Sequence, residues 1–213
     1  MKRIITIALL IVSVHQSQGQ EGESLYASVR NWTAELYIPT IATERVAIDQ
    51  VRFRYFLGER TAFRLTTKYS SNSDEPNVGI KTSITNFELG IGLEKHFASF
   101  KSVSPFFALD YVSASKDATY DEGFQGIFGA LDLAGDERGF TKSGGRFVVG
   151  FDYYPAKGFY VGTEFGMMMT TQRSREIKQG ANKESALIIV EEGNPQRQFH
   201  IGSAGVIRLG FVF

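Results

Sequence analysis

The stretch VRFRYFLGERTAFRLTTKYS, residues 51–70, decides the fold. In each half, side chains of two kinds alternate at every second position, and successive side chains of a β-strand point to opposite faces. One face holds Val51, Phe53, Tyr55, Leu57, Phe63, Leu65, Thr67 and Tyr69, and the other holds Arg52, Arg54, Phe56, Ala62, Arg64, Thr66 and Lys68. Residues 58–60 (Gly-Glu-Arg) form a tight turn between the halves. The stretch predicts a β-hairpin with one apolar and one charged face.

The same alternation recurs along the chain and predicts eight strands. The segments are 31–38, 50–57, 62–69, 86–94, 106–111, 146–153, 159–167 and 199–213. Each can be drawn at roughly 9–11 residues, the length that a tilted membrane strand needs. An even number of strands is typical of single-chain outer-membrane barrels. We therefore expect an all-β, eight-stranded antiparallel transmembrane up-and-down barrel.

Connections and prolines favour this barrel over a secreted β-sandwich, which period two alone also fits. Short connections at 58–60, 96–102 and 155–158 alternate with long ones at 39–46, 71–82, 114–143 and 172–196. Short periplasmic turns and long outer loops give this rhythm. The five prolines, which a strand ladder tolerates only near its ends, fall there. They are Pro39, Pro76, Pro105, Pro155 and Pro195.

The N-terminus predicts export. Lys2 and Arg3 precede an apolar run, and a small-x-small pattern ends at Gly19, so we expect residues 1–19 to be a cleaved signal peptide and 20–213 to form one domain. Removing that segment takes two of 23 basic residues and none of 23 acidic ones, which leaves a net charge of −2. That balance argues against nucleic-acid binding. The sequence has no cysteine, hence no disulfide framework.

The C-terminus reads RLGFVF, with alternating apolar residues and a terminal phenylalanine. This ending looks like the assembly signal of outer-membrane barrels, carried here by Leu209, Phe211 and Phe213, although Arg208 stands where that signal usually has glycine. With this ending and the hairpins at 51–70 and 153–167, residues 25–213 resemble the small outer-membrane barrels typified by the OmpA membrane domain and OmpX, including "outer membrane protein β-barrel domain" and "porin family" chains. The resemblance implies the outer membrane of a Gram-negative bacterium, with outer-membrane lipid, lipopolysaccharide and the barrel assembly machinery as partners.

Ionised residues on the inward face cancel in charge. The acids are Glu35, Glu88, Glu94, Asp110, Asp152 and Glu164, and the bases are Arg52, Arg54, Arg64, Lys68, Arg146 and Arg208. Buried charges persist when they are paired, and an eight-stranded barrel is just wide enough for its side chains. We expect a plugged lumen with an ion-pair network. Glu35 and Arg208, at similar depth on the neighbouring first and last strands, are expected to touch.

Function is less constrained than fold. The preferred hypothesis is a non-enzymatic barrel, without metal or cofactor, that acts in envelope structure or surface interaction, including binding to a host or envelope protein. The sequence does not distinguish this hypothesis from an accessory subunit of an outer-membrane secretion or uptake complex. A narrow porin-like channel and a lipid-modifying enzyme are the alternatives. For the enzyme, His96 falls in a predicted turn and His200 near the outer rim, where Ser70 or Ser174 is a candidate neighbour.

The two longest predicted loops differ in charge. Loop 114–143 is acidic, and loop 172–196 holds Arg173, Arg175, Lys178 and Lys183, which are candidates for contact with lipid phosphates. Residues 186–190 (ALIIV) are apolar. The sequence leaves three alternatives for this run: it extends a hairpin above the membrane, it packs over the barrel mouth, or it forms an adhesive strand edge.

Overall fold

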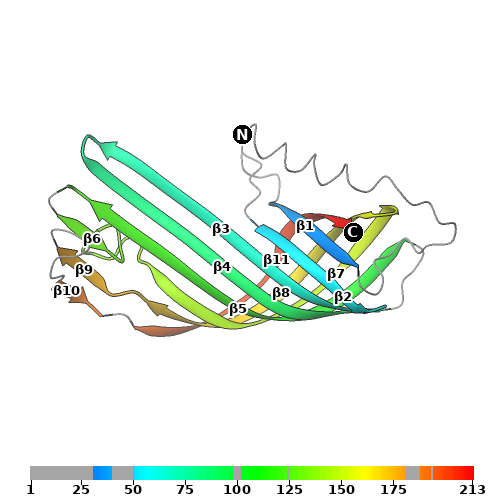
Figure 1. The fold of residues 1–213 in the computed structure, drawn as a ribbon. Helices are drawn as coiled ribbons and strands as arrows, with labels where there is room; N and C mark the ends of the chain where they lie inside the picture. The colour runs from blue at the N-terminus through cyan, green and yellow to red at the C-terminus, as the bar shows by residue number, and fades with distance from the viewer. Residues whose placement is uncertain (1–30, 40–49, 98–101, 124, 181–187, 193) are drawn as a thin grey trace.

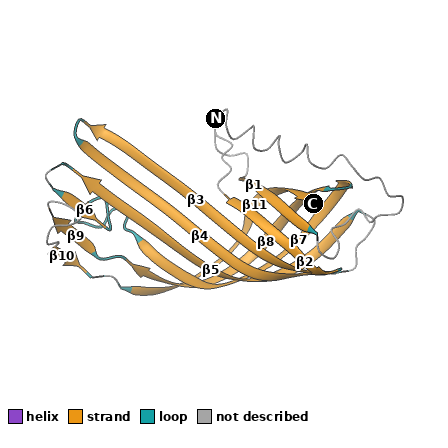
Figure 2. Cartoon of the chain, in the orientation of Figure 1, coloured by secondary structure: helices purple, strands orange, loops and turns teal. Residues whose placement is uncertain are grey.

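The computed structural model describes residues 31–39, 50–97, 102–123, 125–180, 188–192 and 194–213. The predicted signal peptide lies outside these residues. All described elements are strands (Figure 2). They are β1 (Trp32–Pro39), β2 (Gln50–Gly58), β3 (Thr61–Asn77), β4 (Ile80–His96), β5 (Val103–Asp121), β6 (Gly126–Phe128), β7 (Phe140–Ala156), β8 (Phe159–Ser174), β9 (Ile177–Gly180), β10 (Ile188–Glu191) and β11 (Pro195–Val212). No helix long and apolar enough to cross a membrane occurs among the described residues.

Eight of the described strands form a closed antiparallel ring in the order β1-β2-β3-β4-β5-β7-β8-β11. The pairing of β1 with β11 closes the ring, and β5 pairs directly with β7. Every connection joins neighbouring strands, so the topology is up-and-down. The eight predicted segments are the eight strands of this ring, which confirms the predicted fold class.

The apolar face points outward and the charged face points into the lumen. The exposed apolar side chains of the ring strands include Trp32, Phe53, Leu57, Phe63, Tyr69, Phe87, Ile91, Leu93, Leu109, Tyr111, Val149, Phe151, Tyr153, Phe165, Met167, Met169, Phe199 and Ile207. A sandwich would bury this face between two sheets, so the sandwich alternative is wrong for the described part of the chain. A closed barrel with an outward apolar belt spans a bilayer with its backbone groups paired.

Six ring strands are longer than the predicted 9–11 residues. β3, β4 and β7 have 17 residues each, β5 has 19, β8 has 16 and β11 has 18. The predicted loop 71–82 is mostly strand, with only a short turn at Val78 and Gly79, where Gly79 has φ 83°. The prediction ended each strand where its apolar positions ended. The ladder continues beyond that point with polar side chains on both faces.

The two longest predicted loops are partly sheet. β6 pairs with β5 and with β9, and β9 pairs with β10, so strands of connections 114–143 and 172–196 pair with each other and extend the barrel sheet from β5. Ile188–Glu191 forms the outer strand of a hairpin, as one of the three alternatives for this apolar run predicted. We call the described residues of 70–86, 114–142, 170–180 and 188–198 the extension.

The wall of the barrel is uneven in height. Described pairing of β2 with β3 ends at Gln50 and Lys68, and described pairing of β1 with β11 ends at Pro39 and Val206. Above these levels β3, β4 and β5 continue well past β1 and β2 (Figure 1). The lower barrel is therefore walled all round by described strands, whereas the extension is walled mainly by the longer ones.

Candidate functional site

The lower lumen is filled by charged side chains that the strands point inward. We call ten of them the lumen cluster: Glu35, Arg52, Arg54, Arg64, Glu94, Asp110, Arg146, Asp152, Glu164 and Arg208. Five are carboxylates and five are guanidiniums, so the cluster is formally neutral. The guanidiniums of Arg52, Arg54, Arg64 and Arg208 come from β2, β3 and β11, and these residues are each 0% exposed.

Glu35 lies among several cationic partners of the cluster. Arg208 Nη1 lies 3.0 Å from Glu35 Oε2, the contact that the sequence predicts. Arg54 Nε lies 2.8 Å from Oε1, and Arg52 Nη1 lies 3.4 Å from Oε2. The Tyr160 hydroxyl donates a hydrogen bond of 2.8 Å to Oε1. Three cations and a hydroxyl therefore surround one buried acid.

Two other carboxylates tie distant strands together. Arg52 donates to both oxygens of Glu164, at 2.9 and 2.8 Å, in the two-pronged geometry that suits a guanidinium. Asp152 accepts from Arg54 at 2.9 Å and from Arg208 at 2.8 Å. These bonds link β2, β7, β8 and β11 across the lumen, where backbone ladders do not reach.

Inward-facing glycines leave the space that large side chains of the lumen occupy. A Cβ at Gly162 would lie 2.6 Å from Asp152 Oδ1 and 2.7 Å from Arg208 Nη2. A Cβ at Gly210 would collide with the ring of Tyr160. The inward glycines are therefore required by close packing of large side chains on neighbouring strands.

His96 is not in a turn, so that part of the prediction is wrong. It is the last residue of β4 and is 5% exposed. Its Nδ1 lies 2.7 Å from Ser104 Oγ, and its Nε2 lies 2.7 Å from Glu94 Oε1. The ladder continues to the pairing of His96 with Phe106, which the apolar pattern alone did not reveal.

This hydroxyl–imidazole–carboxylate chain fits a packing role. Ser104 is 3% exposed, and Glu94 also contacts the guanidiniums of Arg54 and Arg64. The ligand atoms of Glu94, His96 and Asp152 lie within 4.8 Å of one another. However, both carboxylates already share Arg54 as a cationic partner, so this group does not fit a metal.

Two predicted network members, Glu88 and Lys68, lie above the cluster. Arg146 bonds Asp110 at 3.0 Å below and contacts Glu88 at 3.4 Å above. Lys68 lies opposite Glu88 in the β3–β4 register.

The prediction missed Lys142 on the inward face of β7, because it placed that residue in a loop. It also did not assign Tyr37, whose hydroxyl donates to Glu164 at 3.1 Å. Strand parity places Tyr37 inward, but only register reveals its partner.

The predicted assembly-signal residues lie at the seam that closes the ring. Leu209 pairs with Leu36 of β1, and the ring of Phe211 lies 5.5 Å from that of Phe159. The backbone of Phe213 exchanges hydrogen bonds with that of Trp32 at 3.2 and 2.8 Å. These contacts show a structural role in closure, and recognition by the assembly machinery stays a prediction.

The oppositely charged predicted loops contact each other in the extension. Arg175 Nε lies 3.1 Å from Asp117 Oδ1. Within connection 114–143, Lys116 pairs with Glu137. The guanidinium of Arg138 donates to the carbonyl oxygens of Arg175 and Glu192, at 2.8 and 2.9 Å. Lys183 and the side chain of His200 lie outside the described residues. The backbone of His200 pairs with that of Met168, and His200 lies inside β11 and not at its start.

Comparisons with known proteins find similarity in structure. No protein-family model matches the chain, and no curated protein matches it in sequence. E. coli outer membrane protein W, solved by NMR in solution, is 13% identical with a TM-score of 0.44, and the alignment covers 88% of this chain and 100% of that one. Outer membrane protein AlkL, solved in lipid bilayers, is 11% identical with a TM-score of 0.42, at 93% and 97% coverage. Ail of Yersinia pestis, the attachment invasion locus protein, is 11% identical with a TM-score of 0.39, at 86% and 95% coverage. The chain is thus similar to solved small outer-membrane β-barrels.

Proposed function

We propose that this chain is an integral barrel of a Gram-negative outer membrane, with a closed lumen, that acts in envelope structure or surface interaction through its extension. The observation that carries the proposal is the neutral lumen cluster, whose four innermost guanidiniums are 0% exposed. A path for ions needs water around the side chains that line it, and these four arginines are buried from solvent. Closure of the lumen moves any contact with other molecules to the extension and the outward face.

The outward face supports the membrane part of the proposal. Its aromatic residues, among them Trp32, Tyr153, Tyr69 and Tyr111, lie toward both margins of the apolar belt, as in the interface girdles of outer-membrane barrels. Outer-membrane lipid and lipopolysaccharide are the partners that such a face requires, and the barrel assembly machinery is the route by which it reaches them.

Catalysis is not part of this proposal. A lipid-modifying enzyme needs its nucleophile or base at the membrane edge. His96 and Ser104, which form a hydroxyl–imidazole contact, are instead buried in the lumen.

Single-channel recording in planar bilayers tests the closed lumen. We expect no steady ion-selective current from the wild-type barrel. Arg208→Ala should admit a small current, because it removes a guanidinium that bonds Glu35 and Asp152 across the lumen. Lys81→Ala, on the outward face of the extension, is the matched control and should stay silent. A steady current from the wild type would favour the narrow porin-like channel instead.

Surface interaction has its own test. Ile188 and Ile189 of β10 are 72% and 53% exposed, and β10 pairs on one side only among the described strands. Exposed strand edges recruit partners. Ile188→Ser with Ile189→Ser should lower adhesion of barrel-displaying cells to a basement-membrane extract. Val78→Ser, at the exposed β3–β4 turn, should not. Equal adhesion of all three proteins would end the adhesive role of β10.

A further inference from the structure

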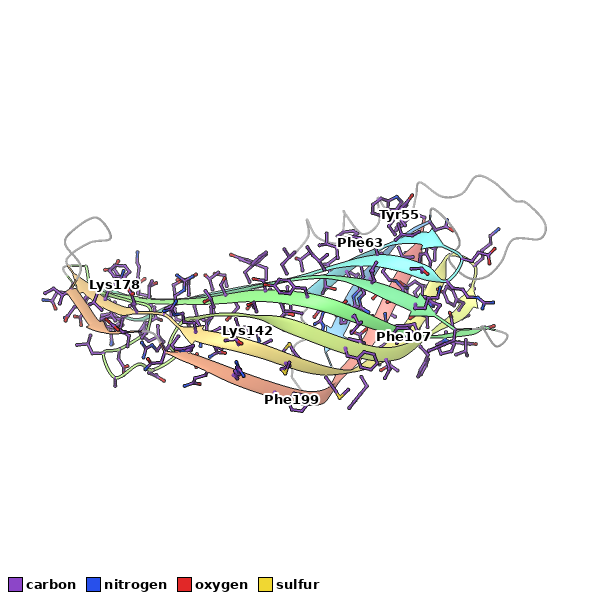
Figure 3. All side chains as sticks on the ribbon, turned by 90° about the horizontal axis from the view of Figure 1, so that it is seen from below. Tyr55, Phe63, Phe107, Lys142, Lys178 and Phe199 are labelled. Carbon is purple, nitrogen blue, oxygen red and sulfur yellow. The ribbon has the colours of Figure 1, made fainter. Side chains whose placement is uncertain are left out.

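The mouth of the lumen, directly above the lumen cluster, is a pocket with a surplus of positive charge. Its volume is about 400 Å³, within the range of small-molecule sites. The lining is Lys68, Ser70, Asn86, Phe87, Glu88, Ala114, Ser115, Phe140 and Lys142. Figure 3 shows Lys142 between the turn end of the barrel, near Phe107, and the tip of the extension, near Lys178.

Strand register explains how this pocket forms. Lys68 pairs with Glu88, Glu88 with Ala114 and Ala114 with Lys142, so one row of inward residues crosses β3, β4, β5 and β7. The small Ala114 leaves room between the charged side chains. In the row above, Asn86 donates to Ser70 Oγ at 3.3 Å, which adds an amide and a hydroxyl to the wall.

The charges of the mouth are unequal. The lining holds two lysines and one carboxylate, Glu88, so its formal charge is +1. Below, carboxylates of the lumen cluster balance its arginines. Between these two inward groups of described residues, the positive surplus therefore lies at the mouth. Low-dielectric walls around a charged recess focus its field and raise the local concentration of anions.

A second, larger cavity of about 850 Å³ in the extension offers a weaker case. Its lining includes Arg175 and Lys178, which are already paired with Asp117 and Glu176 at 3.1 and 3.0 Å. A ligand anion there would compete with these carboxylates. In the mouth, the Lys142 ammonium lies 5.8 Å from the centre of the Phe140 ring, and it forms no ion pair with an acid of the described residues.

We propose that the mouth binds a phosphate monoester carried by a small sugar. Lys142 and Lys68 would bind the phosphate as two flanking ammonium groups, and Ser70 and Asn86 would bond the sugar hydroxyls. The proposal deepens the proposed surface interaction, because a closed lumen makes the mouth a binding pocket and not the entrance of a pore. Binding can nevertheless be measured whether or not the barrel conducts.

Titration calorimetry of the refolded barrel in detergent micelles, at low salt, tests this site. Glucose 6-phosphate, inorganic phosphate and glucose are the three probes. We expect glucose 6-phosphate to bind most tightly, inorganic phosphate more weakly and glucose not measurably. Lys142→Gln and Lys68→Gln should each weaken glucose 6-phosphate by about tenfold, which is the loss of roughly one charge-assisted contact. Lys81→Gln, which removes the same charge from the outward face, should change nothing.

Four outcomes would overturn the proposal. If glucose 6-phosphate does not bind, or binds no more tightly than glucose, the mouth is not an anion-binding site. Inorganic phosphate that binds as tightly as the ester marks an adventitious ion only. Equal loss in Lys81→Gln shows an effect of net charge. Wild-type affinity in Lys142→Gln removes the residue on which the site depends. Circular dichroism of each variant checks folding, and conductance of the same preparation separates failure of this site from failure of the closed-lumen proposal.

Discussion

The inward faces of β3 and β7 carry different cations at two depths. In the lower lumen β3 presents Arg64 and β7 presents Arg146, whereas four residues further toward the extension they present Lys68 and Lys142. Arg64 and Arg146 share Asp110, at 3.1 and 3.0 Å. A guanidinium is planar and weakly hydrated, so it suits buried pairing with carboxylates, whereas an ammonium is strongly hydrated and suits a wet site. The comparison separates a region whose ion pairs link strands across the lumen from the region at which we propose that a ligand binds.

Loss of a central acid should break this contrast most strongly. Glu35→Gln leaves Arg52, Arg54 and Arg208 with a buried excess of positive charge, and removal of one partner of a buried pair costs about 3–5 kcal/mol. Urea unfolding in lipid vesicles, followed by the fluorescence of the single tryptophan Trp32, measures the free energy of unfolding.

The control for this change is an acid outside the lumen. Glu59→Gln, in the exposed β2–β3 turn, should change the free energy of unfolding by less than about 0.5 kcal/mol. Equal effects of Glu35→Gln and Glu59→Gln would mean that the lumen cluster does not stabilise the fold.

Most of the lumen cluster follows from strand parity, which needs no knowledge of register. Alternation in the hairpin of residues 51–70 places Arg52, Arg54 and Arg64 inward, and the structure has them there. The contact of Glu35 with Arg208 was predictable because both lie near chain ends that must meet when the ring closes. Pairs such as Arg52 with Glu164 join strands far apart in the ring, so they depend on strand tilt and side-chain reach, which the sequence pattern does not contain.

The extension shows where sequence reasoning stops. Apolar alternation predicts strand ends that fall short of the ends of the ladder. It therefore predicts a loop at Lys142 and a turn at His96, where the structure has strand. In both cases backbone pairing continues because polar residues satisfy a strand equally well outside lipid. A sequence signal that recognises polar alternation would have recovered both residues.

A methyl group added inside the lumen should have the next largest effect. Gly162→Ala places its Cβ 2.6 Å from Asp152 Oδ1, 2.7 Å from Arg208 Nη2 and 2.9 Å from the carbonyl oxygen of Phe151. The backbone oxygen cannot move away as a side chain can, so we expect a loss of about 1–3 kcal/mol in the free energy of unfolding. The same vesicle assay measures it.

The matched control is an outward-facing glycine of the neighbouring strand, β7. Gly145→Ala meets nothing within 4 Å and should leave the free energy of unfolding within about 0.5 kcal/mol of wild type. If both substitutions were neutral, the lower lumen would be loosely packed, and the contrast with the mouth would lose its physical basis.

The smallest effect concerns an ion pair of the extension. Lys116 holds the pKa of the Glu137 carboxyl below its usual value of 4.5, first through a hydrogen bond and then through its charge. Because the folded pKa is lowered, the pair stabilises the fold above the unfolded pKa, and this contribution is lost as the pH falls through the folded pKa. The group is exposed, so solvent and salt screen the interaction. NMR titration of the Glu137 carboxyl should show the lowered pKa and its return toward 4.5 in Lys116→Gln, whereas Lys81→Gln should leave it lowered. A titration that is the same in all three proteins would show that Lys116 does not stabilise the Glu137 carboxylate, and stabilising ion pairs would then be expected in the lumen cluster and not at this position of the extension.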